Sequence, residues 1–200
     1  MKRFFFAIAF LAATWVSAAV PAHAAVVDGN STAFIASLGK SVVDILENPN
    51  LSEGERIEQY SARFKNAFDW DRISAFAIGR HQRGMPREKF IEYRELFARH
   101  MTRLYAARFA DYSGERFVVK GERQFGRGGS EVTAVISGAD DRDSVKLAFK
   151  VVRDGDRQRI YDVAIDGVSL LVAKRAEVKG IISAGGIDGL IALLKKVNAR

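Results

Sequence analysis

Two acids, Asp162 and Asp166, stand inside the otherwise apolar stretch IYDVAIDGVSLLV, and their spacing raises the question of a catalytic pair. Two carboxylates can act as general acid and general base when they flank one reacting bond. On an extended strand these two share a face about 13 Å apart, wider than the ~5 to 9.5 Å that glycosidases use. The spacing therefore favours a structural role. We expect Asp162 to face solvent or an arginine, and Asp166 with Gly167 to turn into the next helix.

Other residues that could support catalysis or bind a metal lack partners at workable spacing. His81 and His100 show no metal-ligand pattern, and Ser169 stands in DGVSL rather than in a GxSxG elbow. The segments GRGG and AGGIDG lack the spacing of phosphate-binding loops, and ADDRD and RDGDR lack that of a calcium loop. We expect no catalytic residue, no bound metal and no cofactor.

Helical periodicity runs from Ser31 to Arg108 and predicts three or four helices. Asn48-Pro49 ends the first, and Ser52 with Glu55 has the spacing of a capping box that opens the second. We expect Asp71 to cap a short third helix, RISAFAIG, which stops at Gly79. Pro86 suits the first turn of a long fourth helix.

Strand signals follow Ser113-Gly114. The segments ERFVVKG, SEVTAVIS, DSVKLAFKVV and QRIYDVAIDGV are rich in β-branched residues and are separated by turn-forming residues, with Gly155 in a hairpin turn. Helical periodicity returns after Gly167, breaks at 184–186 and resumes behind Asp188, which can cap the last helix. The predicted fold is α+β: N-terminal helices, a four-stranded curved antiparallel sheet and C-terminal helices packed on one side of it.

The N-terminal 24 residues have the pattern of a cleaved signal peptide. Lys2 and Arg3 precede the apolar run FFFAIAFLAATWVSA, and Ala22-His23-Ala24 offers a cleavage site. Residues 25–200 would then form a single exported domain. Without Lys2 and Arg3 the chain keeps 29 basic and 24 acidic residues, a net charge of +5 that suits an anionic membrane or an acidic partner better than nucleic acid. With no cysteine, packing alone must stabilise the domain.

Apolar side chains are abundant in the helices and on one sheet face, and two interpretations remain open. The stripes can fill an ordinary core, or part of them can line a ligand cavity, and periodicity does not separate the two.

Two long blocks carry a resemblance to a known family. YDVAIDGVSLLVAKRAEVKGII followed by GGIDGLIALLKK, and AIGRHQRGMPREKFIEYRELFARHMTRLYAARFADYSGE, resemble the MlaC, or toluene-tolerance, family. The resemblance implies a soluble periplasmic phospholipid carrier with acyl chains in an apolar pocket between sheet and helices. It implies that this carrier shuttles lipid between an outer-membrane lipoprotein complex and an inner-membrane ABC transporter bearing a lipid-binding ring, which maintains outer-membrane asymmetry. We expect a monomer with transient membrane contact, and in a related sub-branch the lipid would be a hopanoid.

Expected pocket residues come from matching the family pattern, from strand parity and from the helical faces. The family pattern gives Val145, Leu147 and Val168, and strand parity adds Phe149, Val163 and Ile165. The remaining expected residues are Leu171 and, from the helical faces, Phe76, Phe97, Met101 and Tyr105.

Two departures from the family pattern predict a more basic and less aromatic pocket mouth. Gln158 stands where the family usually has tryptophan, and GRHQR replaces aromatic residues. Whether Arg80, Arg83 and Arg87 meet a headgroup, a membrane or a protein stays open. A small enzyme and an envelope adaptor with a filled core are the competing interpretations.

Overall fold

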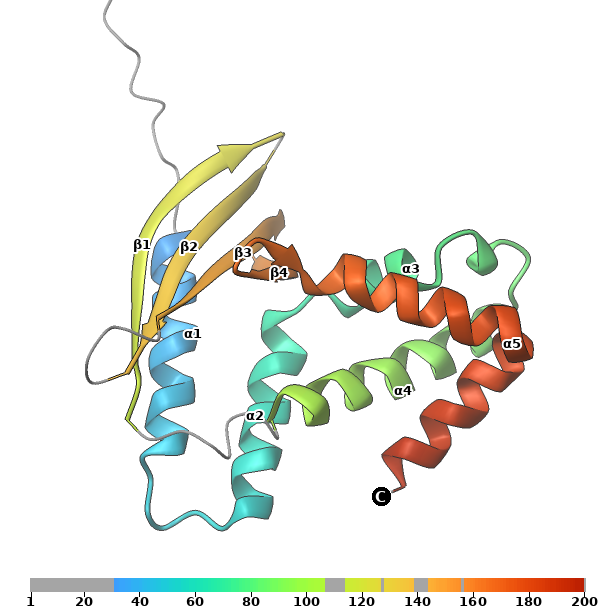
Figure 1. The fold of residues 1–200 in the computed structure, drawn as a ribbon, viewed down its shortest axis with the longest axis horizontal. Coiled ribbons are helices and arrows are strands. Elements are labelled where there is room, and N and C mark those ends of the chain that lie inside the picture. The colour runs from blue at the N-terminus through green and yellow to red at the C-terminus, as the bar shows by residue number, and fades with distance from the viewer. Residues whose placement is uncertain (1–30, 107–113, 127, 139–143, 156, 200) are drawn as a thin grey trace, which may run out of the picture.

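The computed structural model describes residues 31–106, 114–126, 128–138, 144–155 and 157–199, so the predicted signal peptide lies outside the described residues. The fold is α+β, as predicted, with helices before and after one sheet (Figure 1). The helices are α1 Ser31–Leu46, α2 Glu53–Ala67, α3 Trp70–Ile78, the 3-10 helix η1 Gly79–Gln82, α4 Arg87–Ala106 and α5 Leu170–Asn198. The strands are β1 Arg116–Phe125, β2 Gly129–Ser137, β3 Val145–Asp154, β4 Arg157–Ile165 and β5 Val168–Ser169.

The sheet is an antiparallel meander in which each strand pairs with the next along the chain. The described residues form five strands instead of the four predicted. The extra strand arises because Asp166 and Gly167 adopt positive φ angles of 47° and 84°, which turn the chain back so that Ile165 pairs with Val168. The turn predicted at this aspartate is therefore present, but it leads into a two-residue edge strand before the helix begins.

The helix starts follow local capping chemistry, with one correction. The capping box of α2 is confirmed, since the Ser52 hydroxyl accepts from Glu55 N and the Glu55 carboxylate accepts from Ser52 N at 2.8 Å. The cap of α3 was placed wrongly at Asp71. Asp69 caps that helix by accepting from Arg72 N at 3.0 Å, because the helix begins at Trp70, earlier than its apolar run indicates.

The predicted break in the last helix is confirmed at Gly186, whose φ of 65° and ψ of −172° are not helical. Such a conformation is essentially restricted to glycine. Beyond this kink α5 turns back beneath its own first half (Figure 1), and Asp188 forms an ion pair with Lys89 of α4 at 2.5 Å.

Among the described residues, buried apolar side chains form three clusters. One joins α3, α4 and α5, a second joins α1 to the sheet, and a third joins α1, α2 and α4. Figure 1 shows the corresponding layout: the sheet with α1 at one end, α3 to α5 at the other, and α2 between them. Within the described residues, no helix is long and apolar enough to cross a membrane.

Candidate ligand-binding cavity

A cavity of about 620 Å³ lies between the sheet and helices α1, α2, α4 and α5, where the three apolar clusters meet. This volume falls within the ~300 to 1,000 Å³ of small-molecule sites. Its wall is predominantly apolar, and several of its aromatic and aliphatic side chains are only partly covered by protein. The interior of the protein is therefore open to an apolar ligand.

Strand alternation places the sheet residues of the wall. Val145, Leu147 and Phe149 occupy every second position of β3 and so share one face. Their cross-strand partners on β4 add to the same surface, since Leu147 pairs with Ile165 and Phe149 with Val163.

An irregularity in β4 changes the alternation beyond this surface. Lys150 pairs with Asp162 and Val151 with Ile160, so Tyr161 is an extra residue in β4. Such a bulge bends the strand and increases its local twist. Both Tyr161 and Asp162 then contribute to the cavity wall, which simple alternation does not allow for neighbouring residues.

Helix α4 supplies Phe97, Met101 and Tyr105, which recur every fourth residue on one face. A second helical wall was not among the predicted pocket residues. It comes from α1, from the end of α2, from the start of α3 and from the short segment between them, and its members are Ile35, Leu38, Val42, Leu46, Phe64, Phe68 and Trp70. The signal was present as apolar stripes with helical spacing, but those stripes match a filled core equally well.

Gly39 allows α1 to approach the sheet closely at the cavity. A Cβ atom at this position would lie 2.3 Å from Cδ1 of Phe117 on β1, closer than side-chain atoms tolerate. Phe117 in turn makes an edge-to-face contact with Phe149, with ring centroids 6.2 Å apart. The absence of a side chain at Gly39 therefore leaves room for two aromatic rings in the wall.

The structure places nine of the eleven predicted pocket residues in the cavity wall: Val145, Leu147, Phe149, Val163, Ile165, Leu171, Phe97, Met101 and Tyr105. Val168 and Phe76 lie outside it, which corrects their placement. Val168 is 63% exposed because it belongs to the edge strand β5 and no element covers it. Phe76 lies on the outer side of α3 beneath the guanidinium of Arg175, whose carbon is 4.5 Å from the ring centroid.

Asp162 is buried and both of its carboxylate oxygens accept hydrogen bonds, which corrects the expectation that it faces solvent or an arginine. Its carboxylate accepts from Ser169 Oγ at 2.8 and 2.9 Å, from Leu171 N at 3.2 Å and from Lys150 Nζ at 3.2 Å. The side chain is covered because β5 and the first turn of α5 fold back over β4. With its lone pairs occupied in this way, the carboxylate anchors the start of α5 and is not free to accept a substrate proton.

One positive side chain contributes to the cavity wall within the described part of the chain, that of Lys174 on α5. Burial lowers the pKa of nearby His100 on α4, and the positive charge of Lys174 lowers it further. Among the described residues, no group of three histidine, aspartate or glutamate side chains could hold a metal.

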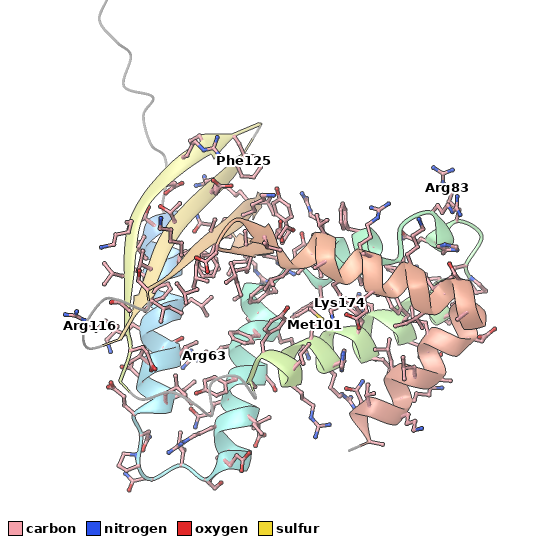
Figure 2. All side chains as sticks on the ribbon, in the orientation of Figure 1. Arg63, Arg83, Met101, Arg116, Phe125 and Lys174 are labelled. Atoms are coloured by element: carbon pink, nitrogen blue, oxygen red, sulfur yellow. The ribbon has the colours of Figure 1, made fainter. Side chains whose placement is uncertain are left out.

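The basic segment expected at the pocket mouth lies elsewhere. Arg80, Arg83 and Arg87 are exposed on η1, at its end and at the start of α4, and none of them lines the cavity. Figure 2 shows Arg83 at the far end of the helical region from the sheet. Gln158 also lies outside the cavity and donates a hydrogen bond to Ser31 Oγ at 3.2 Å.

An α+β fold whose helices and sheet surround an open apolar cavity defines a ligand-binding protein for apolar or amphipathic molecules. The chain belongs to the MlaC protein family, whose model matches residues 37–196. Its fold is similar to that of the phospholipid-binding protein from Ralstonia solanacearum, solved in complex with a phospholipid. The TM-score is 0.71 at 21% identity, and the match covers 84% of this chain and 96% of that one. The comparison with curated protein sequences gave no match.

Proposed function

We propose that this protein is a periplasmic phospholipid carrier that holds the acyl chains of one lipid in the apolar cavity. The observation that carries the proposal is the cavity itself, about 620 Å³ with a predominantly apolar wall, in a chain of the MlaC family. Burying acyl chains is favourable by about 0.8 kcal/mol for each CH₂ group removed from water, so a continuous apolar wall provides affinity without a specific polar anchor. The phospholipid bound by the Ralstonia solanacearum protein of the same fold supports this ligand class.

The carrier would move lipid between the outer and inner membranes and so maintain outer-membrane asymmetry. Its partners would be an outer-membrane lipoprotein complex and an inner-membrane ABC transporter with a lipid-binding ring. A soluble carrier is needed for this task because acyl chains do not cross an aqueous compartment unaided.

The cavity also bears on the competing interpretations. An adaptor requires only a filled core, and an open apolar cavity is unfavourable unless a ligand occupies it. An enzyme requires a convergent acid and base, whereas Asp162 is occupied by its hydrogen bonds and Asp166 is an exposed turn residue outside the cavity.

Native mass spectrometry of the protein, purified from the periplasm without detergent, tests the proposal when followed by lipid extraction. We expect one phospholipid per protein molecule. A hopanoid would keep the carrier function but change the cargo. A well-folded protein that stays free of lipid after incubation with vesicles would contradict the proposal.

A matched pair of glutamate substitutions locates the binding site. Leu147→Glu introduces a charge into the cavity wall, whereas Val168→Glu introduces the same charge at an exposed position on the neighbouring edge strand. A buried unpaired carboxylate costs several kcal/mol, so we expect Leu147→Glu to lose its lipid and Val168→Glu to retain it. Circular dichroism confirms that both variants are folded, and normal lipid content in folded Leu147→Glu would rule out this wall as the site.

A further inference from the structure

Lys174 interrupts a cavity wall that is otherwise suited to hydrocarbon. Its side chain is 11% exposed, so protein covers most of it. Covering a lysine in this way is unfavourable unless the ammonium group gains a partner. A cation at the border of an apolar cavity is suited to an amphipathic molecule that carries a negative group at one end.

The position of Lys174 between two helices fixes where that group would lie. It stands on α5 one turn after Leu170 and Leu171, which also line the cavity. Figure 2 shows it between α5 and α4, and Met101 of α4 lines the same cavity.

The ammonium group of Lys174 pairs with Glu177, three residues further along α5, at 2.5 Å. The Glu177 side chain is 54% exposed. Because water reaches the Glu177 carboxylate, this pair is partly screened and contributes less than a fully buried pair would. The lysine chain is long and flexible, so its ammonium can exchange this carboxylate for a better acceptor at small cost.

Two acids also line the cavity, and neither replaces Glu177 as a partner for Lys174. Asp162 is occupied by Ser169, by Leu171 N and by Lys150, and Glu115 precedes β1 on the sheet side of the cavity. Thr102 of α4, which also lines the cavity, donates its hydroxyl to Ala98 O at 2.8 Å.

We propose that Lys174 binds the phosphate of the lipid headgroup, so that the cavity prefers phosphate-bearing lipids to neutral lipids with the same acyl chains. This inference rests on the proposed carrier function and adds the residue that contacts the headgroup. The acyl chains provide affinity through burial, and the ammonium–phosphate bond provides selection, since a charge-assisted hydrogen bond outside bulk water is stronger than one exposed to it.

A competition between two lipids tests this contact. The full-length exported protein is incubated with vesicles that contain equal amounts of dioleoyl-phosphatidylglycerol and dioleoylglycerol, and native mass spectrometry measures the ratio of the two bound lipids. Because both lipids compete within one sample, the ratio does not depend on the fraction of protein that is folded. We expect the wild type to prefer phosphatidylglycerol and Lys174→Met to reduce that preference about tenfold, the effect of losing one hydrogen bond between charged groups.

Three controls complete the design. Lys174→Arg keeps the charge and should retain the preference, and Lys179→Met removes an exposed charge outside the cavity wall from the same helix and should also retain it. If Lys174→Met binds neither lipid, the ratio of the two bound lipids is measured with Lys174→Gln instead, which removes the charge but keeps a polar side chain.

The outcomes separate this inference from the carrier function. An unchanged ratio in a lipid-binding Lys174→Met variant, or equal binding of the two lipids by the wild type, would overturn the role of Lys174 and leave the carrier function intact. A wild type that binds neither lipid would contradict the carrier function itself.

Discussion

The buried carboxylate of Asp162 should be a major contributor to stability, and Asp162→Ala measures its contribution. The substitution leaves Leu171 N without its acceptor at the start of α5 and removes the partner of Ser169 Oγ. A hydrogen bond to a charged acceptor contributes ~1.5 to 3 kcal/mol, while the Lys150 pair adds less because that side chain is 36% exposed. Allowing for rearrangement of Ser169 toward water, we expect a loss of about 3 kcal/mol from a total of ~5 to 15 kcal/mol.

Urea denaturation followed by circular dichroism gives the free energy of unfolding of each variant. The control is Asp166→Asn, because Asp166 lies in the same stretch but is exposed, and asparagine tolerates its φ of 47°. We expect the control to change the free energy of unfolding by less than about 0.5 kcal/mol. A loss below about 1 kcal/mol for Asp162→Ala would show that the anchoring bonds contribute little, and the structural role argued for this aspartate would be wrong.

Two further predictions concern the kink of α5 and a buried tyrosine. Gly186→Ala should lower the free energy of unfolding by about 1 to 3 kcal/mol, because alanine is strained at a φ of 65° and ψ of −172°. The control Gly185→Ala changes a helical glycine with open space around it and should not lower the free energy of unfolding. Thermal unfolding compares the two variants. Burial raises the pKa of Tyr93 above its ordinary value of 10, so above pH 10 the unfolded state releases a proton that the folded state keeps. Stability should therefore be complete below pH 10 and fall by about 1.4 kcal/mol per pH unit above it, and Tyr93→Phe should remove that part of the dependence in urea titrations at pH 9 and 11.

The sheet side of the cavity could be predicted from sequence because strand parity is a local rule. Once Leu147 is assigned to the inner face, Val145 and Phe149 follow, and pairing adds Val163 and Ile165. The volume of the cavity, in contrast, cannot be predicted from local sequence. Whether the stripe on α1 fills a core or borders a cavity depends on how far that helix stands from the sheet.

Two failures of the sequence-based predictions share a cause: the surroundings of each residue are set by distant segments. Val168 matches a pocket position of the family pattern but lies on the edge strand β5 and is 63% exposed. Asp162 has the parity of an exposed residue, yet β5 and α5 fold over it, and the bulge at Tyr161 shifts the alternation beside it. The cap of α3 is a different, local error: the prediction placed it at Asp71, whereas the helix begins at Trp70 and Asp69 caps it.

The aspartate pair that first suggested catalysis instead determines where α5 begins. Asp166 and Gly167 reverse the chain, and Asp162 then holds the new helix start through Ser169 and Leu171 N. This attachment places Leu170 and Leu171 in the cavity wall and Lys174 one turn further along the same helix. Because an α-helix rises 1.5 Å per residue, anchoring the first turn of α5 also sets the position of Lys174 along the cavity wall. Under the proposed carrier function, Asp162 would influence ligand binding only through the position that it gives to α5, whereas an enzyme would need a free proton acceptor here.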